Sequence, residues 1–426
     1  MMTNETNKNK SVRVNTKRIE DRLKELATFG INSNGGIDRS FGSDEDVKSR
    51  QWLGNLWFEA FHQKTKVDAA ANLWNGIDGA EQLKPIVIGS HHDAVANGGK
   101  YDGALGVLLA TEVMQSLLEN GYPLRHPMKI VSFSAEEPNP YGISTLGSRS
   151  ITGVLKKEDL ESTTHHESKE ELVHTIKRLG GDVDALEEQV LQQNELSAFM
   201  ECHIEQGRNL YDQKIPLAVV TKITGIYREK IKIIGEANHS GTTMMKDRHD
   251  AMLAGAELSL ALEEIITKQK RNDVVGTVGQ FDIFPDSINI IPGEVELIAE
   301  IRTPSKAVLD DLVNEFSNRI HSIEKKRGVQ IVREVILNQA SVPMHDHVQG
   351  ALRKSIDSLG ESFLDLTSMA GHDSVHMAKI TKTGMLFVPS IEGESHCPSE
   401  KTNLLDIAKA GNVLLQAVIT LDEELD

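Results

Sequence analysis

Residues 85–106 read PIVIGSHHDAVANGGKYDGALG, and this stretch predicts an α/β fold. Its apolar start, IVI, is typical of a buried strand, and the apolar residues that follow the loop recur at helical spacing. A loop that joins a strand to a helix lies where ligand-binding groups of α/β proteins collect. This loop carries His91, His92, Asp93 and Asp102. Two imidazoles and two carboxylates on one loop indicate a metal site.

A glycine-rich loop between a strand and a helix can instead bind the phosphates of a dinucleotide. The loop after residue 88 contains no G-x-G-x-x-G motif, and its two acidic side chains would repel a pyrophosphate. Metal binding is therefore the better interpretation of this loop.

The composition sets limits on the architecture and on the partners. A chain of 426 residues exceeds what a single core usually covers, so we expect two domains. The net charge of −17 argues against nucleic acid or an anionic membrane as partner. The polar N-terminus does not resemble a signal peptide, and we expect no apolar stretch near the ~20 residues that span a bilayer. The two cysteines, Cys202 and Cys397, cannot form a disulfide framework, and we expect both to be small buried residues of a cytoplasmic protein.

The order of the predicted elements changes after about residue 215. The following segment reads as strand 222–236, helix 247–270, strands 273–283 and 294–302, helix 305–326 and strand 329–338. This β-α-β-β-α-β order is the ferredoxin-like pattern, which forms a compact unit by itself. We therefore expect an α/β domain made of residues 1–215 and 339–426, with a ferredoxin-like domain of residues 216–338 inserted into it.

Five residues at strand ends or loops of the outer domain are candidate metal ligands: His91, Asp102, Glu137, His203 and His396. Imidazole and carboxylate ligands without thiolate suit zinc, manganese or cobalt in a catalytic site. Five ligands suit a pair of ions ~3.5–4 Å apart that share one bridging carboxylate. A histidine near a strand end is often an ordinary polar residue, and the sequence alone does not show that the five converge.

Two other pairs of histidines have a structural explanation. His165 and His166 lie in a polar segment that we expect to be helical, as is most of 155–195. His345 and His347 flank Asp346, which can cap the next helix. We expect none of these histidines to bind metal.

Eight motifs, in order from residue 89 to residue 400, resemble those of the dinuclear-zinc amidohydrolases of the aminoacylase and carboxypeptidase G superfamily. They are GSHHDAV, GGKYDGALG, AEEPNPYG, ECHIEQG, EANHSGTT, SINIIPGEVELIAEIR, AGHDS and ESHCPSE. More narrowly, HIEQG with NHSGTT resembles the hydantoinase/carbamoylase branch. That branch includes N-carbamoyl-L-amino-acid hydrolases, β-ureidopropionases and allantoate amidohydrolases. The resemblance implies a metallopeptidase-like catalytic domain, in which the inserted domain serves as a lid and as a dimerisation domain.

The resemblance also implies a role for each candidate ligand. Asp102 would bridge two divalent ions, zinc before manganese or cobalt. His91 and His203 would complete one ion, and Glu137 and His396 would complete the other.

The same resemblance implies the catalytic and substrate-binding residues. Glu136 would be the general base, Asp93 would orient His91, and His239 would stabilise the oxyanion. Arg302 would bind the substrate carboxylate through its guanidinium fork. The remaining substrate-binding positions would be Gln206, Asn289, Gly371 and His372. In a homodimer formed through the inserted domain, we expect His239 and Asn289 to act on the partner's metal site.

The expected reaction is hydrolysis of the linear C–N bond of an N-carbamoyl-L-amino acid to the amino acid, ammonia and carbon dioxide. The same chemistry on allantoate, another ureido compound, a small peptide or an N-acyl amino acid stays open. A non-catalytic binding protein on this scaffold is a further alternative. Such a protein would be expected to lack Glu136 or a metal ligand, and the whole set is present.

Overall fold

The computed structural model describes residues 12–426, and the chain divides into two compact units. The first unit consists of the chain up to Thr221 together with Met344–Leu366 and His372–Asp426. The second unit consists of Lys222–Pro343 and Thr367–Gly371. The sequence predicts an inserted domain of residues 216–338, and the main segment of this unit begins and ends a few residues later than that. The unit also includes a short segment that the sequence assigned to the outer domain.

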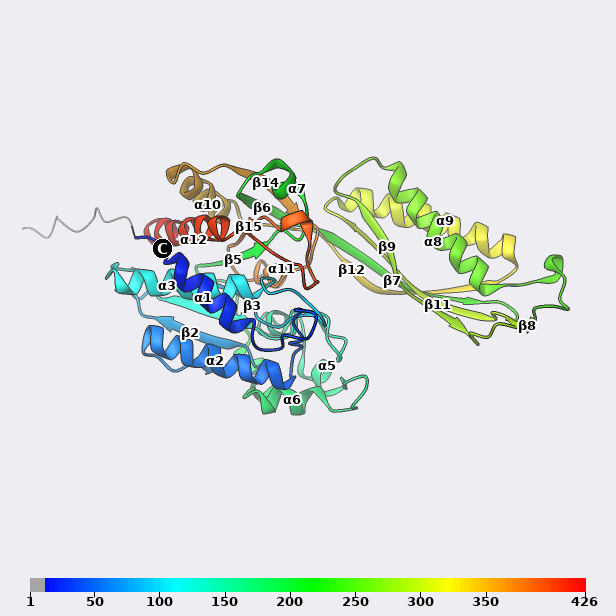
Figure 1. The fold of residues 1–426 in the computed structure, drawn as a ribbon, viewed down its shortest axis with the longest axis horizontal. Helices are drawn as coiled ribbons and strands as arrows, with labels where there is room; N and C mark the ends of the chain where they lie inside the picture. The colour runs from blue at the N-terminus through cyan, green and yellow to red at the C-terminus, as the bar shows by residue number, and fades with distance from the viewer. Residues whose placement is uncertain (1–11) are drawn as a thin grey trace, which may run out of the picture. The chain divides into compact units, whose positions relative to one another are not determined.

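A nine-stranded sheet forms the centre of the first unit (Figure 1). Its strands are β1 (Lys66–Val67), β2 (Leu73–Ile77), β3 (Ile86–His91), β4 (Met128–Phe133), β5 (Ala198–Ile204), β6 (Leu217–Ile223), β13 (Val342–Pro343), β14 (Phe363–Ser368) and β15 (Thr383–Val388). The strand order is β1-β2-β4-β3-β5-β15-β6-β13, and β14 pairs with β6. β3 is parallel to β4 and β5, and β15 is parallel to β5. The carboxyl ends of these four strands therefore meet at one edge of the sheet.

Both faces of this sheet are covered, which explains why the run IVI at the start of β3 is apolar without alternation. Ile86 and Ile88 belong to a hydrophobic cluster with the helices of one face. Val87 belongs to a second cluster with the helices of the other face. The first face is covered by α1 (Thr16–Leu26), α2 (Asp44–Phe61), α3 (Ala104–Glu119), α10 (Asp346–Ser358) and α12 (Leu404–Glu424), and the second by α4 (Leu146–Ile151) and α11 (Ser374–Met377).

By length and composition alone, α12 is the one helix within the described residues that is apolar enough to cross a membrane. Half of its most apolar 18-residue window is buried inside the structure. Ile407, Leu414 and Leu421 are part of the hydrophobic core of the first unit. We therefore assign α12 as a core helix, whose apolar composition reflects packing against the sheet.

The second unit confirms the predicted ferredoxin-like order of elements. Its main elements are β7 (Gly225–Ile234), α8 (Ala251–Lys268), β9 (Val275–Phe284), β11 (Glu294–Thr303), α9 (Lys306–Arg327) and β12 (Gln330–Gln339), and the antiparallel strand order is β12-β7-β11-β9. Alternate residues of β11, such as Val295 and Leu297, are buried in one cluster with residues of α8 and α9. Residues at the other parity, including Glu300 and Arg302, therefore lie on the opposite face of the sheet. A separate two-stranded ladder joins β8 (Asn238–His239) to β10 (Ile290–Ile291).

Residues 155–195 are less helical than expected. They contain α5 (Lys157–Glu161), α6 (Leu172–Arg178) and two single-turn 3₁₀ helices. His165 is in a turn, because its Nδ1 accepts the backbone N–H groups of Glu167 at 3.1 Å and Ser168 at 3.2 Å. The abundance of charged residues in this segment indicated exposure to solvent rather than a continuous helix.

Two smaller expectations were also wrong. The residue that caps α10 is His345, whose side chain accepts the N–H of His347 at 3.2 Å, and Asp346 is already the first helical residue. Cys202 is buried as expected, but Cys397 is partly exposed and its Sγ lies 3.3 Å from the hydroxyl of Ser399.

Candidate metal centre

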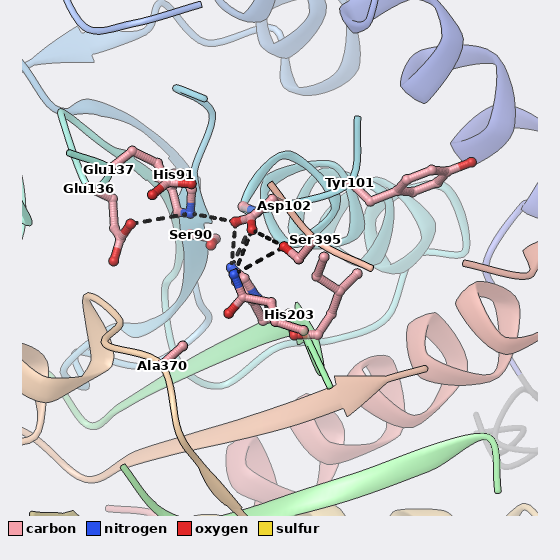
Figure 2. Close-up of polar contacts among 12 residues, drawn as sticks. Ser90, His91, Tyr101, Asp102, Glu136, Glu137, His203, Ala370 and Ser395 are labelled. Carbon is pink, nitrogen blue, oxygen red and sulfur yellow. Dashed lines mark hydrogen bonds and ion pairs between the residues drawn. The ribbon is translucent and has the colours of Figure 1, made fainter. Parts of the chain in front are cut away.

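The structure brings the five predicted ligand side chains together at the carboxyl edge of the parallel strands. Figure 2 shows four of them, His91, Asp102, Glu137 and His203. His91 is the last residue of β3, and His203 is close to the end of β5. Asp102 lies in the loop that leads into α3, Glu137 follows β4, and His396 lies in the loop before α12. All five positions belong to the first unit.

The ligand atoms form two sets that share Asp102, and within each set all atoms lie within 4.8 Å of one another. In one set, Asp102 Oδ1 lies 3.4 Å from His91 Nε2 and 3.2 Å from His203 Nε2. In the other, Asp102 Oδ2 lies 3.3 Å from His396 Nε2, which is 3.2 Å from Glu137 Oε1. Each oxygen of Asp102 thus faces a different set, as in a carboxylate that bridges two ions.

The residues present fit a pair of divalent cations. Glu137 Oε1 is buried, and the polar atom that faces it is His396 Nε2 at 3.2 Å, so this oxygen depends on positive charge from a protonated imidazole or a bound cation. The donors are imidazole nitrogens and carboxylate oxygens, which bind zinc at about 2.0–2.2 Å. Donor atoms 3.2–3.4 Å apart, as seen around Asp102, can be ligands of one ion at such distances.

The charges in the cluster shift its pKa values strongly. Burial opposes ionisation of Asp102, but the charge of His203 and hydrogen bonds from three histidines outweigh it and hold the pKa of Asp102 well below its ordinary value. Interactions with Asp102 and Glu137 raise the pKa of His396 to about 11. Because a histidine ligand must be neutral, a cation entering this site displaces the proton from His396.

The two buried histidines are oriented through Nδ1. The Nδ1 of His91 lies 3.1 Å from the backbone oxygen of Asp93, and the Nδ1 of His203 lies 3.0 Å from that of Ile204. An N–H at Nδ1 that donates to a carbonyl leaves Nε2 as the free ligand atom. Asp93 was predicted to orient His91 with its carboxylate, and that oxygen is farther away, at 3.5 Å.

The carboxylate of Asp93 has a second set of partners in the loop after β4. It accepts the backbone N–H groups of Glu136 at 3.3 Å and Glu137 at 3.2 Å. Ala135, just before this pair, has a φ of 51°, a left-handed conformation that turns the chain sharply at the strand end. Asp93 therefore connects the loop that carries His91 to the loop that carries the two glutamates.

Glu136 is buried beside the ligands without belonging to either set. Its Oε2 lies 3.7 Å from His91 Nε2. Burial, together with the nearby charges of Glu137 and Asp373, raises the pKa of Glu136 well above its ordinary value even though His91 opposes this. A carboxylate with a raised pKa can accept and return a proton near neutral pH.

Gln206 lies against the shared carboxylate. Its Nε2 donates to Asp102 Oδ2 at 2.7 Å and is 3.3 Å from His396 Nε2. His372 is buried, and its ring centroid lies 4.6 Å from that of His203. Both predicted substrate-binding residues of the first unit therefore border the metal ligands.

Glu400 is a residue of the site that sequence reasoning missed. It is buried, and its Oε1 accepts the N–H groups of Tyr101 at 2.8 Å and Asp102 at 3.0 Å. Its Oε2 accepts from the Ser395 hydroxyl at 3.1 Å and the N–H of His396 at 3.3 Å. Glu400 thus holds together the two loops that carry Asp102 and His396. Its position at the end of the motif ESHCPSE was the one available signal.

The remaining predicted residues lie in the second unit. The β8–β10 ladder pairs His239 with Ile290, and the N–H of Ser240 donates to the backbone oxygen of Asn289 at 3.0 Å. His239 and Asn289 are thus brought together at an exposed position. The Nε of Arg302 donates to Glu300 at 2.6 Å, and its Nη1 donates to the backbone oxygen of Met369 at 3.0 Å. Gly371 lies in the same short segment as Met369, and a Cβ at Gly371 would meet open space.

Comparison with known proteins gives consistent matches along most of the chain. Residues 87–420 match the family model described as Peptidase family M20/M25/M40. An N-carbamoyl-L-amino acid amidohydrolase from Geobacillus stearothermophilus is 34% identical over 402 residues, covering 94% of this chain and 97% of that protein. A ureidoglycolate hydrolase from Arabidopsis thaliana is 33% identical over 410 residues, covering 95% and 86%. The crystal structure of a hydantoinase/carbamoylase family amidase from Burkholderia multivorans superposes with a TM-score of 0.86 at 29% identity, covering 97% of this chain and 100% of that one.

Proposed function

Because the chain belongs to Peptidase family M20/M25/M40, we propose that it is a metal-dependent amidohydrolase that cleaves the linear C–N bond of N-carbamoyl-L-amino acids. One observation carries this proposal: two sets of ligand atoms share the carboxylate of Asp102. The products are the amino acid, ammonia and carbon dioxide. A similar carboxylate-bearing ureido compound, such as allantoate or ureidoglycolate, is the second candidate substrate, because a ureidoglycolate hydrolase is about as similar to this chain.

The two sets would hold two divalent ions, zinc in the first place and manganese or cobalt as alternatives. His91, His203 and Asp102 would hold one ion, and Glu137, His396 and Asp102 would hold the other. When bound, such ions supply the Lewis acidity that makes a water nucleophilic near neutral pH.

Glu136 is the general base and later the general acid. It takes a proton from the attacking water, whose oxygen forms a bond to the ureido carbon. It then delivers that proton to the nitrogen of the amino acid as the C–N bond breaks. The carbamic acid released in this step decomposes to ammonia and carbon dioxide. The raised pKa of Glu136 supports both transfers, because the same group must accept and return the proton.

Substrate-binding roles fall to named residues of each unit. Arg302 binds the substrate carboxylate. A guanidinium has five N–H donors, and the bonds to Glu300 and Met369 use only donors of Nε and Nη1, so further N–H groups are available for the substrate. His239 stabilises the oxyanion. Gln206, Asn289, Gly371 and His372 complete the contacts.

The test of this proposal is a substrate screen with zinc, manganese or cobalt added. N-carbamoyl-L-amino acids, allantoate, ureidoglycolate and dipeptides are supplied one at a time, and ammonia and the free amine are measured together. We expect ammonia and amine in equal amounts from N-carbamoyl-L-amino acids. Release of amine from dipeptides, with no turnover of any ureido compound, would contradict the proposed substrate class.

The protein acts as a cytoplasmic homodimer on a small ureido or amide substrate, without nucleic acid or membrane as partner. The inserted unit forms the dimer, and His239 and Asn289 serve the partner's metal centre. Exposure of both residues supports an action across subunits. Mixing inactive His239→Ala chains with inactive Glu136→Gln chains should restore activity, because one site in each mixed dimer carries neither defect. Mixed dimers that form and stay inactive would exclude the role in trans.

A further inference from the structure

A groove of about 340 Å³ lies in the first unit, between α1, the loop that leads into α3, and the start of α12. Tyr101 lines this groove and directly precedes Asp102 in the sequence. Figure 2 shows that the side chain of Tyr101 points away from the carboxylate of Asp102. The groove therefore lies on the opposite side of this loop from the metal ligands.

The groove is basic although the chain as a whole carries a net charge of −17. It is lined by Lys24, Lys100 and Lys401, with Glu20 as its one acidic residue. Glu20 is already paired with Lys24, at 2.5 Å. Within residues 12–426, no carboxylate lies within ion-pair distance of Lys100 or Lys401. Two ammonium groups without a carboxylate partner make the groove attractive to an anion.

The start of α12 adds backbone donors to this charge. The side chain of the capping residue Asn403 accepts no backbone N–H, and its amide donates instead to Asp406 at 3.3 Å. The first N–H groups of this 21-residue helix therefore lack a side-chain cap. Thr402, which lines the same groove, is 3% exposed, and its hydroxyl has no hydrogen-bond partner within the described residues. A buried hydroxyl without a partner is rare in folded proteins, so Thr402 has a hydrogen-bonding capacity that a water or a ligand group can fill.

One side of the groove is apolar. Leu23 of α1, Ala27 just after the end of α1 and Ile407 of α12 form this side, and the exposed Ile31 lines the groove with them. A ligand that fills the groove therefore needs a charged end and an apolar body.

We propose that this groove binds a small organic anion, with a carboxylate or phosphate group at Lys100, Lys401 and the first turn of α12, and an apolar body against Leu23 and Ile407. The site is distinct from the metal centre, and the proposal does not depend on the proposed reaction.

The position of the two lysines gives the site a regulatory consequence. Lys100 precedes Tyr101 and Asp102, and Lys401 follows Glu400. Glu400 already joins these two loops by accepting the N–H groups of Tyr101 and Asp102. An anion held by both lysines joins the same loops from the other side, so it restricts the motion of the loop that carries Asp102.

The binding test uses the complete chain, loaded with zinc, and isothermal titration calorimetry. Hexanoate supplies a carboxylate with an apolar body, inorganic phosphate supplies an anion alone, and hexanol supplies the apolar body alone. We expect saturable binding of hexanoate, and weaker binding of phosphate and hexanol. Tighter binding of phosphate than of hexanoate would contradict the proposal that the ligand has an apolar body, and would assign the site to inorganic phosphate or similar anions.

Because carboxylates also bind metal ions, variants decide where the anion binds. Lys100→Gln/Lys401→Gln should weaken hexanoate binding by at least about tenfold, since two charged hydrogen bonds are lost. The matched control is Lys64→Gln/Lys129→Gln, which removes two lysines from a different surface groove and should leave binding unchanged. Equal binding by the two double variants, or no saturable binding at about 10 mM hexanoate, would overturn the proposal.

Hydrogen–deuterium exchange tests the link between the loops. Hexanoate should slow exchange in peptides that cover residues 99–103 and 397–403, in the wild type and in the control variant alike. Binding that leaves exchange in both peptides unchanged would show that the groove does not restrain the loop of Asp102.

Discussion

The two sets of ligand atoms around Asp102 are built differently. The side chains of His91 and His203 are 1% exposed, and both belong to central strands of the sheet. The side chain of His396 is 45% exposed and lies in a loop, at a residue with a φ of 57°. A ligand on a buried strand is held by the core, whereas a ligand on an exposed loop depends on a few hydrogen bonds. The first set therefore forms a rigid, enclosed site, and the second forms a site that solvent and substrate can reach.

The largest effect is expected from Asp102→Asn, because this residue belongs to both sets. An amide carries no charge and offers one oxygen, so both ions should be lost and activity should fall to background. Metal content is measured by mass spectrometry after gel filtration. His165→Ala is the control and should keep both ions. An Asp102→Asn chain that keeps one tightly bound ion would show that the sets are independent.

Glu136→Gln should reduce turnover by at least ~10²-fold while metal content and fold stay unchanged, because a general base is lost and no ligand is. The measurement is the turnover number at saturating substrate together with the metal content of the same sample. Loss of an ion along with turnover would make Glu136 a ligand and reverse the roles of the glutamate pair.

Glu400→Gln tests in particular the set of ligand atoms that includes His396. Glu400 holds the backbone N–H groups of Asp102 and His396, so the amide variant should lower metal affinity by about 10–100-fold, the usual effect of a residue that supports a ligand. Competition with a fluorescent chelator measures both affinities. We expect the weaker ion to be affected most. Unchanged affinities would mean that these hydrogen bonds do not support the metal centre.

Acidity should weaken the metal centre. In the metal-free protein the pKa of His396 is raised to about 11, so near neutral pH this residue carries a proton that the cation must displace. Lower pH therefore favours the proton, and affinity should fall by up to about tenfold for each pH unit below neutrality. Calorimetry of zinc binding in buffers of different ionisation enthalpy should show proton release. Binding without proton release would contradict the assignment of His396 as a ligand.

Most of the fold and most of the candidate ligands could be predicted from the sequence, for identifiable reasons. The central strands of the first unit contain short apolar runs that lead into polar side chains, as at His91 and His203. The order of elements in the second unit follows from regular periodicity.

Other features depend on contacts that a sequence does not display. Glu400 acts through backbone N–H groups of a loop that lies 298 residues away in the sequence. His345 rather than Asp346 caps α10, because both residue types can accept an N–H and the local backbone decides between them. The apolar surface of α12 is buried by packing against distant elements, so its composition alone could not separate a core helix from a membrane span.

The central claim is that this chain holds two divalent ions on one shared carboxylate, and that hydrolysis depends on them. The most direct test is to titrate chelator-treated, metal-free protein with zinc while following bound metal and hydrolysis of an N-carbamoyl-L-amino acid. We predict no activity at the start, a first equivalent bound tightly by the buried set, and full activity as the second equivalent fills the half-exposed set. Full activity in protein that contains no metal would contradict the account.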